Sequence, residues 1–508
     1  MRTQATAKPA LLCQRDAKAP SHFFGDLPQI TPIGSGTGLF LIIQYIQKAG
    51  YTVVCTEAQQ AVFASAGALH RVSVSDANSK MDRKRVEFGK RMLQHFDFDP
   101  EYRNLNHASF GVAPREIRKH MQHHRDLCES RPDSYVRYEY PAILDENRVA
   151  MAKFVNAPVD TIVFVPNATT GIDTVFRNLT WDADGKDEII YFSTIYGACA
   201  KIIDYVVDNS SGKVSSRGIP LSYPCEDEDI IQAFHSALED CKNAGKRAKI
   251  CLFDTVSSLP GICFPYKAIT KGCRAAGVLS LVDGAQSVGQ TPIDLNSLDP
   301  DFFVSNCHKW LFVPRSCAVF YVPLRNQHMI TSSLPTSHGY ISKSGSRFNP
   351  LPPSRKPAFV NNFEFVGTLD TSAYICVKEA IEWRERVLGG EEEIFNYCHN
   401  LARSGGGEVA SILGTEVMEN AANTLSKCAM INVALPLDAE HTSIVTQHWI
   451  MKTLVEEYKT FIPLIAHRGR IWARMSAQVY TDMDDFNWAG HQLLELCNRV
   501  KRGDTNAQ

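Results

Sequence analysis

The stretch Phe302-Phe-Val-Ser-Asn-Cys-His-Lys-Trp310 decides how this sequence is interpreted. It is a short apolar run, typical of a buried strand, and it ends in His308, Lys309 and Trp310. Upstream, a second apolar run, Val278-Leu-Ser-Leu-Val-Asp-Gly284, ends in Asp283. A lysine at a strand end is most often a solvated surface residue, so this pair alone is a weak signal. The segments around it decide whether it carries chemistry.

Apolar runs and helical patterns alternate between about residues 145 and 330. The runs typical of strands are Thr161–Val165, Glu188–Phe192, Lys249–Asp254, Val278–Asp283, Phe302–Cys307 and Ala318–Val322, with helical patterns such as Gly197–Val207 and Tyr266–Gly277 between them. This alternation predicts an α/β fold with a large, mainly parallel sheet covered by helices on both faces. Such sheets bind ligands at the carboxyl ends of their strands. Asp283 and Lys309 both fall at such ends.

A lysine and an aspartate at neighbouring strand ends are what pyridoxal phosphate requires. The lysine amine forms a Schiff base with the cofactor aldehyde, and the aspartate holds a proton on the pyridine nitrogen. The segment Asn167-Ala-Thr-Thr-Gly171 follows a predicted strand and opens a helix, whose free N–H groups would bind the phosphate. An ordinary helix cap is the alternative for this segment by itself. Together with Lys309 and Asp283, the phosphate interpretation is favoured.

Three further side chains are candidates for the same site. Tyr196 follows the run Glu188–Phe192 and would stack on the pyridine ring or act as an acid, with a core tyrosine as the alternative. Gln286 would donate a hydrogen bond to the phenolic oxygen of the cofactor. Arg474 would grip a substrate carboxylate with its planar fork, and a surface ion pair is the alternative. Asp254, Ser257 and Ser258 also lie at a strand end and would line the site without a defined role.

Composition excludes several other classes of protein. The 508 residues are 44% hydrophobic and 21% charged, with a formal net charge of −2, so no basic surface for nucleic acid is expected. No apolar run approaches the ~20 residues of a membrane span. None of the fifteen cysteines forms a Cys-x-x-Cys pair, which favours reduced thiols and a cytoplasmic location. A mitochondrial presequence is the alternative that the basic bias of the first 25 residues suggests.

The predicted domain organisation has four parts. Residues 1–80 are a poorly patterned extension whose Gly34–Gly38 stretch reads as a plain loop, and the basic piece Met81–Lys90 reads as helical. Residues 81–144 would contribute to a small domain and to the active site, and residues 145–370 form the large cofactor-binding domain, with a long loop at Thr331–Phe359. Residues 371–508 form a smaller α+β domain with helices at Thr371–Val387 and 483–501. No metal is expected, because His120-Met-Gln-His-His124 reads as a solvated helix face.

Five motifs resemble those of one known family, and they occur in its order. They are Asn104-Leu-Asn-His-Ala-Ser-Phe-Gly111, Asn167-Ala-Thr-Thr-Gly171, Asp283-Gly-Ala-Gln286, Asn306-Cys-His-Lys-Trp310 and Phe365-Val-Gly-Thr-Leu-Asp370. The chain is similar to the class V aminotransferase superfamily of pyridoxal phosphate enzymes, fold type I. Within it the chain looks most like the isopenicillin N epimerase-like branch, which includes fungal hercynylcysteine sulfoxide lyases. The resemblance covers roughly residues 85–500.

The resemblance implies a role for each matching residue. Lys309 would be the catalytic Schiff-base lysine, and Tyr196 would be the second catalytic residue and stack on the ring where relatives often have His. The cofactor would further contact Ala168, Thr169, Asp283, Gln286, Asn306 and His308, and Thr368 would reach the phosphate of a second subunit, which implies a homodimer. Arg474, Asn106, His107 and Arg137 would bind the amino-acid substrate. Ala108 departs from the family, which commonly has Gly there.

The resemblance leaves the reaction open among three outcomes. Loss of the Cα proton followed by loss of a sulfur group from Cβ makes a C–S lyase, which releases pyruvate and ammonia and is the favoured activity. Reprotonation would instead make an amino-acid epimerase or an aminotransferase. A desulfurase needs a cysteine on a mobile loop, and the Thr331–Phe359 loop has none. A non-catalytic scaffold is a further alternative, against which Lys309, Asp283 and Arg474 all argue.

Overall fold

The computed structural model describes residues 12–14, 52–54, 87–345 and 347–506. The chain divides into two compact units, residues 1–84 and 85–508. The described part of the first unit is an antiparallel pair of short strands, β1 (Leu12–Gln14) and β2 (Thr52–Val54). The loop expected at Gly34–Gly38 lies outside the described residues, as does most of the helix expected over Met81–Lys90. Within the described chain, no helix has the length and apolarity needed to cross a membrane.

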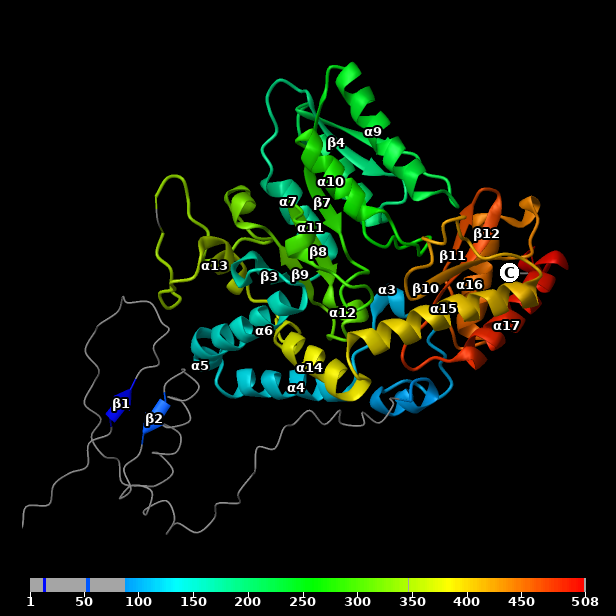
Figure 1. Ribbon diagram of the computed structural model, residues 1–508, viewed down its shortest axis with the longest axis horizontal. Coiled ribbons are helices and arrows are strands. Elements are labelled where there is room, and N and C mark those ends of the chain that lie inside the picture. Colours follow the sequence, from blue (N-terminus) through cyan, green and yellow to red (C-terminus); the bar gives the residue numbers. More distant parts are fainter. Residues whose placement is uncertain (1–11, 15–51, 55–86, 346, 507–508) are drawn as a thin grey trace, which may run out of the picture. The chain divides into compact units, whose positions relative to one another are not determined.

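A seven-stranded sheet dominates the second unit (Figure 1). Its order is β3-β9-β8-β7-β6-β4-β5, and only β9 runs antiparallel to its neighbours. The bounds are β3 Ile162–Val165, β4 Asp187–Phe192, β5 Val214–Ile219, β6 Arg247–Asp254, β7 Leu279–Asp283, β8 Phe302–Asn306 and β9 Ala318–Tyr321. The prediction of a mainly parallel α/β sheet is therefore confirmed, with strand ends within two residues of those expected.

Helices cover both faces of this sheet, and alternate strand residues point to different faces. Leu281 and Val304 pack with the side chains of α7 (Ala168–Asn178), α8 (Gly197–Asn209) and α13 (Ala358–Glu364). Val282 and Phe303 belong to the cluster on the other face, with α6 (Tyr140–Phe154), α9 (Asp227–Asn243) and α10 (Tyr266–Ala276). By this alternation, Asp283 lies on the face covered by α7 and α8.

A second, three-stranded antiparallel sheet forms the carboxyl-terminal part of the unit, in the order β10-β12-β11. Its strands are β10 Met430–Ala434, β11 Leu464–His467 and β12 Arg470–Ser476. Three helices build a separate core with it: α15 (Glu391–Leu413), α16 (Ile444–Glu456) and α17 (Met483–Lys501). The helix expected over residues 483–501 is confirmed.

The remaining elements are short or connect these two sheets. The α-helices are α3 His107–Phe110, α4 Arg115–Ser130, α5 Pro132–Ser134, α11 Leu295–Leu298, α12 Cys307–Trp310 and α14 Val377–Leu388. A π-helix spans Tyr135–Glu139, and 3₁₀ turns lie at Lys90–His95, Val159–Thr161, Leu324–Met329, Tyr374–Cys376, Ala439–His441 and Asp504–Asn506.

Three expectations about secondary structure are wrong. Strand β5 was missed because Ser215, Ser216 and Arg217 interrupt its apolar pattern at the edge of the sheet. The helix expected over Met81–Lys90 does not reach its end, because Gly89 has φ of 90°, which a right-handed helix excludes. The helix expected from Thr371 begins as an α-helix only at Val377, after a 3₁₀ turn.

Candidate active site

Three polar residues stand side by side at the carboxyl edge of the large sheet. Asp254 and Asp283 end β6 and β7 and are register partners, so their side chains share a face of the sheet, on strands that are about 4.8 Å apart. Asn306 ends β8, two residues beyond Val304, which is the register partner of Asp283. All three side chains are buried and lie on the face of α7 and α8. The site is therefore a row along three adjacent strands.

Lys309 follows this row in the short helix α12. The side chain is buried, and its amine forms no hydrogen bond or ion pair with any described residue. Burial lowers the pKa of Lys309 to about 8, although the nearby Asp283 and Asp254 carboxyls oppose this effect. A buried, unpartnered amine with such a pKa is suited to attack an aldehyde.

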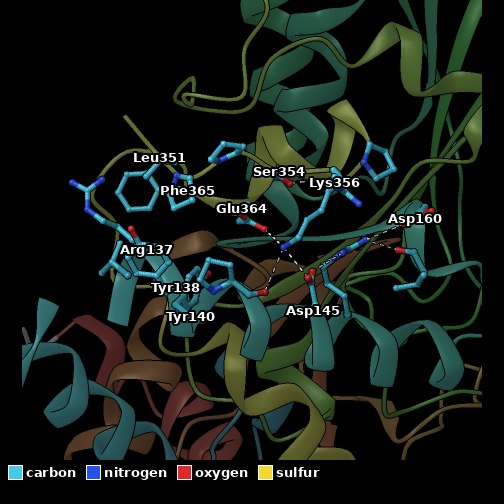
Figure 2. A pocket seen from close by; sticks show the side chains of 18 of the residues that line it. Arg137, Tyr138, Tyr140, Asp145, Asp160, Leu351, Ser354, Lys356, Glu364 and Phe365 are labelled. Atoms are coloured by element: carbon cyan, nitrogen blue, oxygen red, sulfur yellow. Dashed lines mark hydrogen bonds and ion pairs between the residues drawn. The ribbon is translucent and has the colours of Figure 1, made fainter. Parts of the chain in front are cut away.

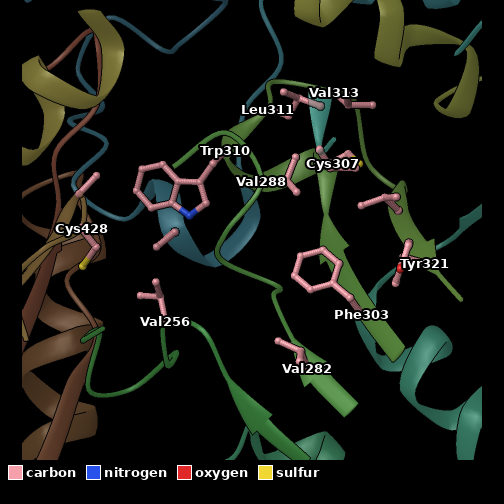
Figure 3. Close-up of a cluster of buried hydrophobic side chains, with 14 of the residues drawn as sticks. Val256, Val282, Val288, Phe303, Cys307, Trp310, Leu311, Val313, Tyr321 and Cys428 are labelled. Atoms are coloured by element: carbon pink, nitrogen blue, oxygen red, sulfur yellow. The ribbon is translucent and has the colours of Figure 1, made fainter. Parts of the chain in front are cut away.

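The backbone of α12 is tightly held from several sides. The Nε2 atom of His107 lies 2.6 Å from the Lys309 carbonyl oxygen, and Arg384 donates to the Trp310 carbonyl at 2.8 Å. Gly111 has φ of 62°, and a Cβ built on it would lie 1.8 Å from the His308 carbonyl oxygen. Figure 3 shows Trp310 among the buried apolar side chains around this helix. The position of Lys309 is thus fixed by packing that only the folded chain provides.

His107 was expected to line the substrate pocket, and the structure places it behind Lys309. It is 1% exposed, with Nδ1 2.9 Å from the Tyr480 hydroxyl and Nε2 on the Lys309 carbonyl. Burial lowers its pKa to about 3, so the ring is neutral at physiological pH. In this chain His107 orients α12. Tyr480 was not anticipated, because its position in the sequence carries no signal.

Asp283 is surrounded by donors that favour its charged form. The Ala285 N–H donates to Oδ1 at 2.9 Å, and the Cys199 thiol donates to Oδ2 at 3.8 Å. Burial is the largest effect and keeps the pKa of Asp283 above its ordinary value, although Ala285, Lys309 and Cys199 lower it in that order. Cys199 was missed by sequence reasoning. Its place one helical turn after Tyr196, at the start of α8, was the available signal.

Tyr196 lies at the amino-terminal cap of α8, and 49% of its surface is exposed. This exposure excludes the core-tyrosine alternative and leaves the ring free to contact a ligand.

The start of helix α7 is organised around Asn167 and Asn306. The Asn167 side chain accepts from Thr170 N at 2.9 Å, and Asn306 Oδ1 accepts from Ala168 N at 2.9 Å. The Thr169 N–H has no partner among the described residues. Asn306 therefore holds the helix start in place, and an N–H remains free for an anion, which helix amino termini favour.

His308 sits beside this group with a different set of contacts. Its Nδ1 lies 2.9 Å from the Cys317 carbonyl oxygen. Burial is the main reason that its pKa falls to about 4.

Gln286 is oriented by α12 and α3. Its Nε2 donates to the Ala108 carbonyl at 3.0 Å, and its Oε1 accepts from the Trp310 indole N–H at 2.7 Å. One amide hydrogen remains for another acceptor. The Ala108 methyl group is fully buried, so the departure from Gly is accommodated at this point.

Arg474 is a buried cation in β12 without a counter-ion. Its Nη2 donates to Asn106 Oδ1 at 2.6 Å and to Ser109 Oγ at 2.9 Å, and its Nη1 donates to the Ser258 carbonyl at 2.5 Å. Its Nε has no partner, and no described carboxylate pairs with it. Burial lowers its pKa to about 10. Because an uncompensated buried charge is costly, the guanidinium is prepared for an anionic ligand.

Two predicted residues lie apart from this group within the chain. Arg137 is in the π-helix, where it donates to Asp133 at 3.1 Å and to the Pro350 carbonyl at 2.9 Å. It borders a cavity of about 720 Å³ together with Leu351 and Phe365 (Figure 2). Thr368 is exposed in the loop after α13. Neither residue contacts the group around Lys309.

The residues brought together fit pyridoxal phosphate. A free buried amine, a strand-end carboxylate with its own donors and a helix start with a free N–H supply partners for the aldehyde, the pyridine nitrogen and the phosphate. The fold and this constellation define a pyridoxal phosphate enzyme of fold type I.

The family follows from direct comparison. The model of the aminotransferase class V family matches residues 118–451, so the chain belongs to that family. The L-cysteine desulfhydrase-like protein lolT1 of Epichloe uncinata is 36% identical over 83% of this chain and 98% of its own length. Hercynylcysteine sulfoxide lyase of Schizosaccharomyces pombe is 32% identical over 81% of this chain and 98% of its own length. Isopenicillin N epimerase of Streptomyces clavuligerus is 24% identical over 58% of this chain and 71% of its own length.

Solved structures share the fold at low sequence identity. The cystine C-S lyase C-DES, in complex with cysteine persulfide, has a TM-score of 0.64 at 18% identity, covering 80% of this chain and 99% of its own. The cysteine desulfurase CsdA from Escherichia coli has a TM-score of 0.61 at 17% identity, and the match covers 81% of this chain and 98% of CsdA.

Proposed function

We propose that this protein is a pyridoxal phosphate-dependent lyase that breaks the C–S bond of a cysteine conjugate, or of its sulfoxide, by β-elimination. The observation that carries the proposal is the buried, unpaired Arg474, which supplies a carboxylate site in a chain that also places a free Lys309 amine beside Asp283. The names of the L-cysteine desulfhydrase-like and hercynylcysteine sulfoxide lyase relatives support the choice of a sulfur-containing amino acid.

Each residue has a defined task in this reaction. Arg474 binds the α-carboxylate, and its contacts with Asn106 and Ser109 fix the guanidinium plane. Lys309 would hold the cofactor through its amine and would accept the Cα proton of the substrate. Asp283 would hold the proton on the pyridine nitrogen. The bound cofactor supplies an electron sink that makes the Cα proton acidic.

Bond changes in the substrate then balance without an added oxidant or reductant. The Cα–H bond breaks, a Cα–Cβ double bond forms, and the sulfur leaves Cβ with the bonding electron pair. The sulfur fragment takes up a proton, and water hydrolyses the released enamine to pyruvate and ammonia. Tyr196, half exposed at the start of α8, would deliver this proton.

Two competing activities use the same residues. An epimerase would return a proton to Cα, and an aminotransferase would place it on the cofactor carbon. The isopenicillin N epimerase relative keeps the first alternative open at lower identity. A desulfurase is disfavoured, because the Thr331–Phe359 loop has no cysteine and burial raises the pKa of Cys199, which keeps that thiol protonated.

The assembly and location belong to the same proposal. We infer a homodimer in which the exposed Thr368 of one subunit reaches the phosphate bound by the other. Arg137 would line the substrate pocket. We assign the protein to the cytoplasm because the cysteines of residues 87–506 are free thiols. Residues 81–144 and 371–508 are assigned to the small domain, and residues 145–370 to the large one.

The test is to incubate the purified protein, loaded with pyridoxal phosphate, with an S-substituted cysteine sulfoxide. We expect pyruvate and ammonia in equal amounts, measured with coupled dehydrogenases. The Lys309→Ala variant is the matched control, and it should release neither product and lack the near-visible absorption of the wild type. If no pyruvate forms while the Cα proton exchanges with deuterated water, the lyase proposal fails and the epimerase or aminotransferase alternative replaces it.

A further inference from the structure

Asp254 is a buried carboxyl group to which the reaction above gives no task. It is 7% exposed and ends β6, one strand away from Asp283. No described residue forms a hydrogen bond with its side chain, whereas Asp283 receives two. Buried carboxyls are normally hydrogen-bonded, because losing water without a replacement partner is costly. An unbonded carboxyl at this edge therefore points to a ligand.

The ring of the cofactor has a fixed relation to this row of strands. In pyridoxal phosphate the pyridine nitrogen lies opposite the aldehyde carbon, and the phosphate arm and the phenolic hydroxyl flank that carbon on opposite sides. The phosphate site is at the start of α7, which Asn306 holds at the end of β8. The nitrogen partner, Asp283, ends β7, and β6 lies on the side of β7 away from β8. A ring held at both of these places would turn its phenolic oxygen toward β6.

We infer that Asp254 donates a hydrogen bond from its protonated carboxyl group to the phenolic oxygen of pyridoxal phosphate. This inference rests on the cofactor assignment made above and extends it to one more atom of the ring. Gln286, expected from the sequence to make this contact, keeps only one free amide hydrogen. Asp254 would supply its donor from the end of β6, whereas Gln286 is held by Ala108 and by Trp310, which follows β8.

The neighbouring charges decide which of the two carboxyls keeps its proton. Burial and the adjacent Asp283 raise the pKa of Asp254 well above its ordinary value, and only Lys309 opposes them. Asp283 has the Ala285 N–H and the Cys199 thiol to stabilise its charge. Two like charges one strand apart are unfavourable. The negative charge therefore resides on Asp283, and Asp254 remains a neutral donor.

A donor at the phenolic oxygen changes the acidity of the bound cofactor. Without this hydrogen bond, the oxygen is more basic and holds the proton that it shares with the nitrogen of the Lys309 linkage more tightly. The absorption of the bound cofactor, followed against pH, therefore reports on Asp254 without any turnover. A hydrogen bond to a charged oxygen contributes enough to move that spectrophotometric pKa by about 1 unit.

The experiment is a pH titration of the absorption band of the purified holoenzyme, without substrate. Asp254→Ala should raise the spectrophotometric pKa by about 1 unit. Asp254→Asn, which has the same shape and keeps an N–H donor, should shift it by less than half as much. Glu188→Gln is the matched control. Glu188 is a buried carboxylate near the amino end of β4, away from the carboxyl edge of the sheet, and pairs with Arg217 at 2.8 Å. Its replacement should leave the titration unchanged.

Two results would overturn the inference. An Asp254→Ala holoenzyme that titrates like the wild type shows that the phenolic oxygen does not depend on this residue. Equal shifts in the Ala and Asn variants show that the charge of the carboxyl group, not hydrogen-bond donation, is responsible. Absence of any bound-cofactor band in the wild type would instead refute the proposed function, so the two failures are distinguishable.

Discussion

Replacing Arg474 tests the substrate site most directly, because the guanidinium is buried and its charge is unpaired. Burial lowers the pKa of Arg474 from 12.5 to about 10. At about 1.4 kcal/mol per pKa unit, the buried cation is destabilised by about 3 kcal/mol. A carboxylate that binds there can recover a free energy of this order, which corresponds to about 100-fold in affinity.

In Arg474→Met we therefore expect substrate affinity to fall about 100-fold while the fold survives. Removing the buried, unpaired cation offsets the loss of its hydrogen bonds to Asn106, Ser109 and the Ser258 carbonyl, so the melting temperature should stay within about 2 °C of the wild type. Arg474→Lys is the matched control. It keeps the charge but not the planar fork, and should lose an intermediate amount of affinity.

The assay compares the Kd of a cysteine conjugate with that of the matching cysteamine conjugate, which lacks the carboxylate. Both values are read from the change in absorption of the bound cofactor. In the wild type the carboxylate should contribute about 100-fold, and in Arg474→Met this preference should disappear. If the variant still prefers the cysteine conjugate by the wild-type factor, Arg474 does not bind the carboxylate and the reasoning is refuted.

Two further predictions concern α12. Gly111→Ala should lower the free energy of unfolding, measured in denaturant titrations, by about 3 kcal/mol or more, because φ of Gly111 is 62° and the new Cβ would meet the His308 carbonyl. The control is Gly407→Ala, which lies in open space within α15 and should raise the free energy of unfolding by up to about 1 kcal/mol. Equal effects of the two substitutions would contradict this prediction. The rate at which the apoprotein takes up pyridoxal phosphate should rise about tenfold per pH unit and level off near pH 8, where the Lys309 amine is half neutral. A rate that keeps rising to about pH 10 in stopped-flow absorbance would indicate an ordinary lysine.

The parts of the site that could be read from the sequence are those coded by local pattern. Asp283 and Lys309 each close an apolar run, and Asn167 opens a helix, so their place at one edge of a parallel sheet followed from alternation alone. Strand β5 was missed because an edge strand is half solvated and does not need a continuous apolar run. The helix expected from Thr371 begins only at Val377, because the spacing of apolar residues does not distinguish the preceding 3₁₀ turn from an α-helix.

Contacts between distant segments had no such signal. Cys199 meets Asp283, and Tyr480 meets His107, because the fold brings together residues separated by tens to hundreds of positions. Arg474 was a candidate by residue type, but its burial and its lack of a counter-ion are properties of the packed β12 strand. His107 was expected to line the substrate pocket, but its ring contacts the Lys309 carbonyl oxygen behind the lysine, which no local pattern indicates.

The sequence by itself determined the family, the cofactor and the order of the strand-end residues, because each is encoded in short motifs and in hydrophobic period. Only the tertiary structure decided which groups are charged and which are neutral. Asp254 and Asp283 are both aspartates at strand ends, and residue type does not distinguish them. Asp283 accepts hydrogen bonds from the Ala285 N–H, two residues further on, and from the Cys199 thiol of a distant helix, whereas the Asp254 side chain has no donor among the described residues. Protonation in a buried site depends on its surroundings in three dimensions, which residue type and spacing do not encode.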